Sequence, residues 1–317
     1  MLKQMAKAAL SDETLFAARR FRVRSIHWLF AQLGFNVAKR SDYYSPLPVL
    51  DRLARTQARW SKPSELSGVR YDIGRMRAFL LGLHRKWQGD FDAFTGDYAE
   101  NCKKGFGPGY PQFDARVLFY MLREIKPKRY LEVGSGLSTF YASRAAEANT
   151  HDGHPLGIRC IEPYPYDALR TICSSDLVQD EVQNVPLSEF LKLEPGDVLF
   201  IDSSHALKID SDVAYLILEV LPRIAKGVHI HIHDVPFPHN VPFPSSTWIF
   251  GQFWPMYWNE AMVVQAFLTF NSAFDIELSA PLIRHFDEAC LASNFPGYRL
   301  LANDENPPSA LWLVRTQ

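Results

Sequence analysis

The sequence has few of the features that mark secreted, disulfide-stabilised or membrane-spanning proteins. It contains only four cysteines, and none of them forms the closely spaced pair that zinc knuckles and redox motifs require. It offers no run of about 18 apolar residues to span a bilayer, and its first residues lack the apolar core of a signal peptide. We therefore expect a cytoplasmic protein without a transmembrane segment or a disulfide framework.

Net charge is also nearly absent. The 34 lysines and arginines are balanced by 35 aspartates and glutamates, which gives a formal net charge of -1. A charge this small creates no field that would draw nucleic acid to the whole molecule, so we expect no nucleic acid among its partners. Apolar residues make up 47% of the chain, which is enough for a substantial hydrophobic core.

The chain changes character at a segment rich in glycine and proline. Residues 1–104 show helical periodicity without strand alternation, whereas residues 105–317 begin with glycines and prolines and then alternate strands with helices. We predict that the helical N-terminal region packs on the main domain, covers a substrate or mediates homo-oligomer formation. Residues 19–30 mix arginines with bulky apolar side chains, and they either pack in this way or lie on a membrane surface.

The alternation in residues 105–317 is typical of an α/β protein with a Rossmann-like, doubly wound, mostly parallel sheet. The last two strands can pair as its antiparallel edge. Helices are expected near residues 114–124, 138–148, 166–173, 210–223 and 259–269, and the seven strands near 129–133, 157–162, 182–185, 197–202, 228–234, 274–279 and 311–315.

Four core strands of this predicted sheet end at or beside a carboxylate. Glu132, Glu162, Asp202 and Asp234 take these places, and a hydrophobic core has no need of them. In an open parallel sheet the ligand crevice lies beyond the carboxyl ends of the strands, where the strand order reverses. We therefore predict that the four acids surround one ligand site.

A glycine-rich turn follows the first of these strands. Gly134 and Gly136, on either side of Ser135, allow a tight turn and a close approach to a ligand because they have no Cβ atom. The turn lacks the third glycine of a dinucleotide fingerprint and the lysine of a phosphate-binding loop. Glu162, at the end of the next strand, can accept both hydroxyls of a ribose. Together the turn and the acid indicate a nucleoside ligand, although each alone also fits an ordinary turn or strand end.

These segments resemble the successive motifs of class I S-adenosylmethionine-dependent methyltransferases. The most similar group is the bacterial methyltransferase domain related to macrocin O-methyltransferases, and the similarity covers about residues 113–315. The resemblance implies S-adenosylmethionine as cofactor and a small-molecule or glycan acceptor. The segments that carry it are 132–139, 161–163, 197–205 and 231–234, and the cofactor-binding residues that it implies are Glu132, Gly134, Ser135, Gly136, Glu162 and Asp202.

Related metal-dependent methyltransferases bind a divalent ion through acids that follow the fourth and fifth strands. Asp202 and Asp234 match these positions, and with His233 they form the candidate site for Mg²⁺ or Mn²⁺. Polar contact with the cofactor or a loop is the alternative role of the two acids. Val235 departs from the pattern, which has asparagine there. His205 replaces the lysine base of the catechol type, so we interpret His205 and Asp202 as catalytic.

Two further features are expected beside the crevice: a strand with alternating histidines and an aromatic segment that follows it. Histidine alternates with isoleucine in residues 228–234, so His229 and His231 share a face with His233, and we interpret the first two as buried packing residues. Residues 235–258 are rich in aromatic side chains. They form either the wall of an acceptor pocket or a small core against the N-terminal helices. No role is predicted for Glu260.

The predicted function is methylation of a hydroxyl on a small molecule, sugar or natural product. The residues leave two alternatives open. One is a metal-dependent hydrolase or oxygenase built on the same sheet, and the other is a protein that binds the cofactor without catalysis.

Overall fold

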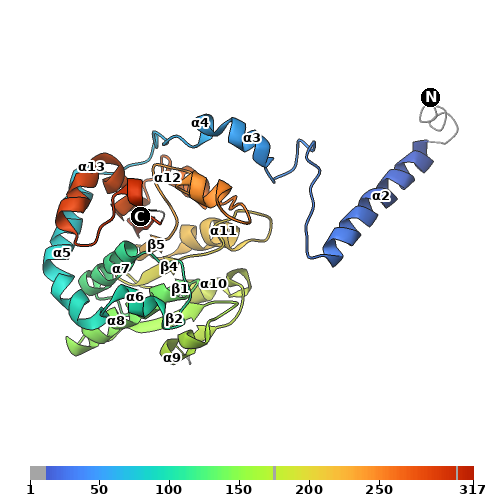
Figure 1. The fold of residues 1–317 in the computed structure, drawn as a ribbon. Coiled ribbons are helices and arrows are strands. Elements are labelled where there is room, and N and C mark those ends of the chain that lie inside the picture. Colours follow the sequence, from blue (N-terminus) through green and yellow to red (C-terminus); the bar gives the residue numbers. More distant parts are fainter. Residues whose placement is uncertain (1–11, 174–175, 305) are drawn as a thin grey trace. The chain divides into compact units, whose positions relative to one another are not determined.

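The computed structural model describes residues 12–173, 176–304 and 306–317, which divide after Gln57 into two compact units (Figure 1). The first unit contains α2 (Asp12–Gln32), which includes the basic and apolar segment, and α3 (Leu50–Arg55). None of the helices in the described part of the chain has the length and apolar character needed to cross a membrane.

The division between the units falls after Gln57 and not at residue 104. The reason is that α5 (Ile73–Thr95) packs against α7 (Gln112–Ile125) and α8 (Leu137–His151). Buried side chains of α5, such as Leu80, belong to the same hydrophobic core as those of α7 and α8. By packing, residues 58–104 are therefore part of the α/β unit.

The second unit is built on a seven-stranded sheet with the order β3-β2-β1-β4-β5-β7-β6. Neighbouring strands from β3 to β5 are parallel, and β7 runs antiparallel to both β5 and β6. This arrangement confirms the predicted doubly wound, mostly parallel sheet with an antiparallel edge. The strands are β1 (Arg129–Val133), β2 (Gly157–Ile161), β3 (Leu177–Val178), β4 (Val198–Ile201), β5 (His229–Ile232), β6 (Phe274–Ser279) and β7 (Leu311–Arg315).

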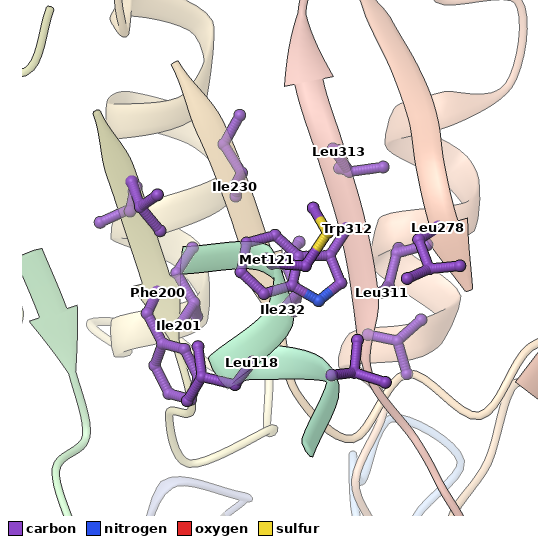
Figure 2. Packing of buried hydrophobic residues seen from close by; sticks show 14 of the residues in the cluster. Leu118, Met121, Phe200, Ile201, Ile230, Ile232, Leu278, Leu311, Trp312 and Leu313 are labelled. Carbon is purple, nitrogen blue, oxygen red and sulfur yellow. The ribbon is translucent and has the colours of Figure 1, made fainter. Parts of the chain in front are cut away.

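Helices cover both faces of the sheet. Every residue of β4 is buried, although successive side chains point to opposite faces, so each face must be covered. Leu118 and Met121 of α7 belong to the same buried cluster as Phe200 of β4 and Trp312 of β7 (Figure 2). The other helices are α4 (Gln57–Trp60), α6 (Tyr98–Cys102), α9 (Arg170–Cys173), α10 (Leu187–Phe190), α11 (Asp212–Tyr215), α12 (Glu260–Leu268) and α13 (Ala280–Asn294).

The helix α7 shows how the sequence sets an element that supports the site. Its apolar residues Val117, Leu118, Met121 and Leu122 recur at helical spacing and are buried. The helix ends where Lys126 adopts a left-handed conformation, immediately before a proline that cannot continue the hydrogen-bond ladder. Asp114 in the first turn of α7 lies 3.5 Å from His233, so this turn is beside the end of β5.

Two predicted elements differ from the observed ones, and one helix was not predicted. The strand expected at residues 182–185 is wrong, because β3 lies earlier, at Leu177–Val178, and Val182–Asn184 forms a 3-10 turn. The helix expected at 210–223 is irregular after α11, and Pro222 contributes because it lacks the amide of a regular helix. The helix α13 had no predicted counterpart, although Ser279 caps its first turn.

Candidate active site

A cavity of ≈ 520 Å³ lies at the carboxyl ends of β1, β2 and β4. The strand order reverses beside β1, and ligand crevices of open parallel sheets form at such a point. The volume is in the range of small-molecule sites. The walls are Val133, Gly134, Ile161, Glu162, Pro163, Tyr164, Glu181, Val182, Gln183, Asp202, Ser203, Ser204, Lys208, Asp210, Ser211 and Asp212.

The glycine-rich turn fits closely against the end of β4. Gly134 has a φ of +77°, and a Cβ atom on it would lie 1.7 Å from the carbonyl oxygen of Asp202. The Gly134 amide donates to the Ile161 carbonyl at 3.0 Å, and the Asp202 amide donates to the Val133 carbonyl at 2.8 Å. Only glycine fits this position, because both the left-handed backbone and the short approach exclude a side chain.

Glu162 presents its carboxylate to this cavity. One oxygen accepts a hydrogen bond from the Ser135 amide at 3.0 Å, and the other accepts one from the Tyr164 amide at 2.8 Å. Two backbone amides therefore fix the carboxylate, and each oxygen retains a lone pair for a hydroxyl of a ligand.

Glu132 does not line the cavity, although it was expected to bind the cofactor. It is fully buried and accepts hydrogen bonds from the hydroxyls of Ser138 and Thr139, each at 2.6 Å. The Thr139 hydroxyl in turn accepts from the Gly136 amide at 3.0 Å. Glu132 thus fastens the turn to the start of α8. Ser135 and Gly136 are also absent from the described walls, and they shape the turn through their backbone.

Two carboxylates and two imidazoles meet where β4 and β5 end. The Nε2 atom of His205 lies 3.2 Å from Asp202 and 3.4 Å from Asp234, while Nδ1 of His233 lies 3.4 and 3.7 Å from the same two acids. His205 and Asp234 have φ angles of +57° and +54°, a region that residues other than glycine rarely adopt and that is enriched at functional sites. The structure therefore brings all four predicted residues into one cluster, the acid–histidine cluster.

His205 is held by residues that the sequence did not connect to it. Its Nδ1 atom lies 2.8 Å from a carboxylate oxygen of Glu260, which is 1% exposed, and its ring lies 4.6 Å from that of Trp258. The amides of Asn259 and Glu260 both donate to the His205 carbonyl. The start of α12 thus fixes the backbone and the ring of His205, which leaves Nε2 directed toward Asp202 and Asp234.

The charges of the acid–histidine cluster shift its protonation equilibria. Burial lowers the pKa of His205, but hydrogen bonds to Asp202 and Glu260 and the charge of Asp234 outweigh burial and place this pKa well above its ordinary value. The pKa of His233 is also raised well above its ordinary value, because Asp234 and Asp202 outweigh the effect of burial. Burial raises the pKa of Asp202, but the two imidazoles more than offset it, so this pKa is lowered.

Asp202, His233 and Asp234 could hold a metal ion, since one ligand atom from each lies within 4.8 Å of the others. The Nδ1 atom of His233 is buried and lies near Asp202 and Asp234, but among the described residues it makes no hydrogen bond of good geometry. Its Nε2 atom lies 3.5 Å from Asp114 and 3.3 Å from the Ser309 hydroxyl, which also donates to Asp234. Metal-binding histidines are usually oriented in this way, with the second ring nitrogen held by an acid. The donor set therefore fits a divalent cation.

The two remaining histidines of β5 take part in packing. His231 is fully buried, stacks on Phe200 at 4.2 Å and lies 3.3 Å from the Tyr110 hydroxyl. His229 is half-buried and paired with Glu277 at 2.6 Å. Neither belongs to the acid–histidine cluster.

The aromatic insertion at residues 235–258 contacts both the acid–histidine cluster and the segment that precedes α5. A cavity of ≈ 10 Å³ beside the acid–histidine cluster is lined by His205, Asp234, Trp258 and residues 240–242, so the insertion forms a wall there. The insertion also packs against residues that precede α5, through the hydrogen bond of His239 to the Ser61 carbonyl.

The strand order and the position of the cavity define a class I methyltransferase fold. Consistent with this class, residues 131–235 match the model of a family described as a methyltransferase domain. This segment runs from β1 to β5 and includes the acid that follows each core strand. The more specific relationship to macrocin O-methyltransferases stays a prediction.

One curated relative is similar to part of the chain. A protein of Archaeoglobus fulgidus named "Uncharacterized protein" is 34% identical over 89 residues, which are 27% of this chain and 39% of the relative. The chain therefore spans about two fifths of that relative's length.

Solved structures with related folds include the SAH-bound methyltransferase PaMTH1 of Podospora anserina, at 15% identity and a TM-score of 0.37 over 86% of this chain and 99% of that one. An O-methyltransferase of Bacillus cereus in complex with SAH shares 11% identity with a TM-score of 0.41, over 73% of this chain and 97% of that one. The O-methyltransferase TomG of Streptomyces achromogenes, in complex with SAM, shares 13% identity with a TM-score of 0.34, over 78% of this chain and 92% of that one. Likeness of this size says nothing about the activity of this chain.

Proposed function

We propose that this protein transfers a methyl group from S-adenosylmethionine to a hydroxyl oxygen of a small molecule, sugar or natural product. The observation that carries the proposal is that Asp202 belongs to two neighbouring sites. It lines the ≈ 520 Å³ cavity and also contacts His205 in the acid–histidine cluster. A cofactor cavity and a group that can accept a proton therefore meet at one residue.

The cavity walls suit a nucleoside with a cationic sulfur. Glu162 would accept the ribose hydroxyls, and Gly134 would let the backbone approach the methionine part. Residues 182–183 would lie against the adenine. When bound, S-adenosylmethionine supplies an electrophilic methyl group, so a carbon–oxygen bond to the acceptor forms as the carbon–sulfur bond breaks.

His205 is the proposed base. Its Nε2 atom would take the proton of the acceptor hydroxyl, while Glu260 on Nδ1 fixes the tautomer and orientation of the ring. Asp202, His233 and Asp234 would hold a divalent cation, which would lower the pKa of an acceptor hydroxyl. Because one of these ligands is an imidazole, we expect Mn²⁺ to bind more tightly than Mg²⁺.

Calorimetric titration of the full chain with S-adenosylhomocysteine tests the cofactor assignment. We expect saturable binding to the wild type and no comparable binding of NAD. The methyl transfer itself is tested by detecting S-adenosylhomocysteine release with a panel of catechols, sugars and phenolic natural products, with and without Mn²⁺. Tight binding of Mn²⁺ by a folded protein that binds no S-adenosylhomocysteine would reject the proposal and favour a metal-dependent hydrolase or oxygenase.

A further inference from the structure

A second cavity contains a buried cation whose charge lacks a partner. Arg116 of α7 is 9% exposed, and among the described residues no carboxylate lies within 4.0 Å of its guanidinium group. Its contacts are a long hydrogen bond of 3.4 Å to the Tyr120 hydroxyl and the ring of Phe91 at 4.7 Å. A buried charge without a counter-charge is costly, so the site favours an anion.

Arg123, farther along the same helix, shows how the fold normally satisfies such a group. It is 3% exposed and donates to the carboxylates of Asp90 and Asp152 and to the amide oxygen of Asn149. Unlike Arg123, Arg116 has no carboxylate among its described contacts.

Arg116 lines a cavity of ≈ 250 Å³ together with the first turn of α7. The N-cap residue Pro111 offers no side-chain hydrogen bond to that turn. The first amides of an α-helix have no intrahelical acceptor, and the helix dipole places partial positive charge there. The acid of this turn, Asp114, is not among the described walls of the cavity, and its carboxylate contacts Ser309 and His233. Among the described walls, the charged side chains are Arg116, Arg299 and Asp304.

The remaining walls are largely aromatic. Tyr98, Phe113, Phe295 and Tyr298 line the cavity, and the ring of Phe113 lies 5.1 Å from Phe295 and 5.6 Å from Tyr298. Flat apolar groups pack well against such rings, and a cavity of this size holds a small ligand.

We propose that this cavity binds a small molecule with a flat apolar body and a carboxylate or phosphate group, which pairs with Arg116 and the first turn of α7. Guanidinium groups form strong charge-assisted hydrogen bonds with both anions. The described walls of this cavity share no residue with those of the cofactor cavity, so the inference does not depend on the proposed methyl transfer.

The test uses benzoate as the probe, with benzamide as its neutral counterpart and inorganic phosphate as an anion without a ring. Calorimetry on the full chain should show saturable binding of benzoate and much weaker binding of benzamide. Phosphate should compete with benzoate, because both occupy the anion position. Failure of the wild type to bind either anion would overturn the proposal.

Two variants locate the binding. Arg116→Met should weaken benzoate binding about tenfold or more, the scale of one lost charge-assisted contact. In anion-free buffer its stability to urea should be no lower than that of the wild type, because a buried unpaired charge has been removed. Arg299→Glu, at an exposed position in the cavity wall, should also weaken benzoate binding. This variant tests the site if Arg116→Met does not fold.

Arg223→Glu is the matched control, since it makes the same charge change at an exposed position where Arg223 is paired with Glu219. It should bind benzoate like the wild type, as should Glu162→Ala in the cofactor cavity. Wild-type affinity in folded Arg116→Met, or equal losses in Arg299→Glu and Arg223→Glu, would show that benzoate binds elsewhere or only through general charge.

Discussion

Replacing Gly134 by alanine should damage the protein far more than replacing an unconstrained glycine with the same backbone conformation. Gly134 and Gly153 have φ angles of +77° and +82°, so alanine would carry the same left-handed penalty of about 1–2 kcal/mol at either position. At Gly153 nothing lies within 4 Å of the added Cβ atom. Gly153→Ala therefore measures the backbone penalty alone.

At Gly134 the added Cβ atom would lie 1.7 Å from the carbonyl oxygen of Asp202. This oxygen cannot move away freely, because the amide of the same residue donates to the Val133 carbonyl and fixes the end of β4 against β1. Overpacking of this kind typically costs about 1–3 kcal/mol. Added to the backbone penalty, the loss for Gly134→Ala should be about 2–5 kcal/mol.

Equilibrium urea denaturation of the wild type and both variants measures these losses, and calorimetry with S-adenosylhomocysteine measures the effect on the cavity. Gly153→Ala should keep wild-type affinity, whereas folded Gly134→Ala should bind poorly, because the turn and Asp202 are forced apart. Equal stability losses in the two variants would refute the close approach of Gly134 to Asp202.

Three further predictions test the other parts of the site. Glu162→Ala should fold and should weaken S-adenosylhomocysteine binding by about 1–3 kcal/mol in calorimetry, the cost of losing hydrogen bonds to a charged acceptor; unchanged affinity would remove Glu162 from the site. Asp234→Asn should lose most Mn²⁺ affinity while it retains S-adenosylhomocysteine binding, and equal Mn²⁺ affinity would place the ion elsewhere. His205 has a raised folded-state pKa, so its stabilising contribution is complete below its unfolded pKa of ~6.5 and is lost as pH rises through the folded value. In chelator, the stability gap between wild type and His205→Gln, measured in urea, should therefore narrow as pH increases above ~6.5, and a gap that widens would contradict the ion pairs.

The parts of the site that the sequence predicted are those that follow from strand direction. Glu162, Asp202 and Asp234 each follow a parallel strand, and parallel strands end at the same edge of a sheet, so their proximity could be expected before the structure. Glu132 instead lies inside β1, one residue before its end, and its side chain faces inward to Ser138. The sequence did not fix the strand ends to one residue, and a shift of one residue reverses the face to which a side chain points.

The supporting residues come from elements that no local pattern links to the strand ends. Glu260 contacts His205 from the start of α12, and Asp114 and Ser309 contact His233 from the first turn of α7 and the segment before β7. These contacts depend on how helices pack over the sheet edge, which periodicity does not specify. The strand β3 escaped prediction for a different reason. As described, it comprises Leu177 and Val178, and so short a strand has no alternation.

The raised pKa of His205 links the proposed base to the proposed cation site. A histidine with this pKa is protonated near neutral pH and cannot accept a proton until it has lost one. The pKa is raised in part by Asp202 and Asp234, the same carboxylates that would hold a divalent cation. Positive charge bound between these acids would offset their effect on Nε2 and lower the pKa of His205 toward the range in which it can act as a base. In the described arrangement, one pair of carboxylates would therefore both position the cation and determine when His205 is free to accept the proton.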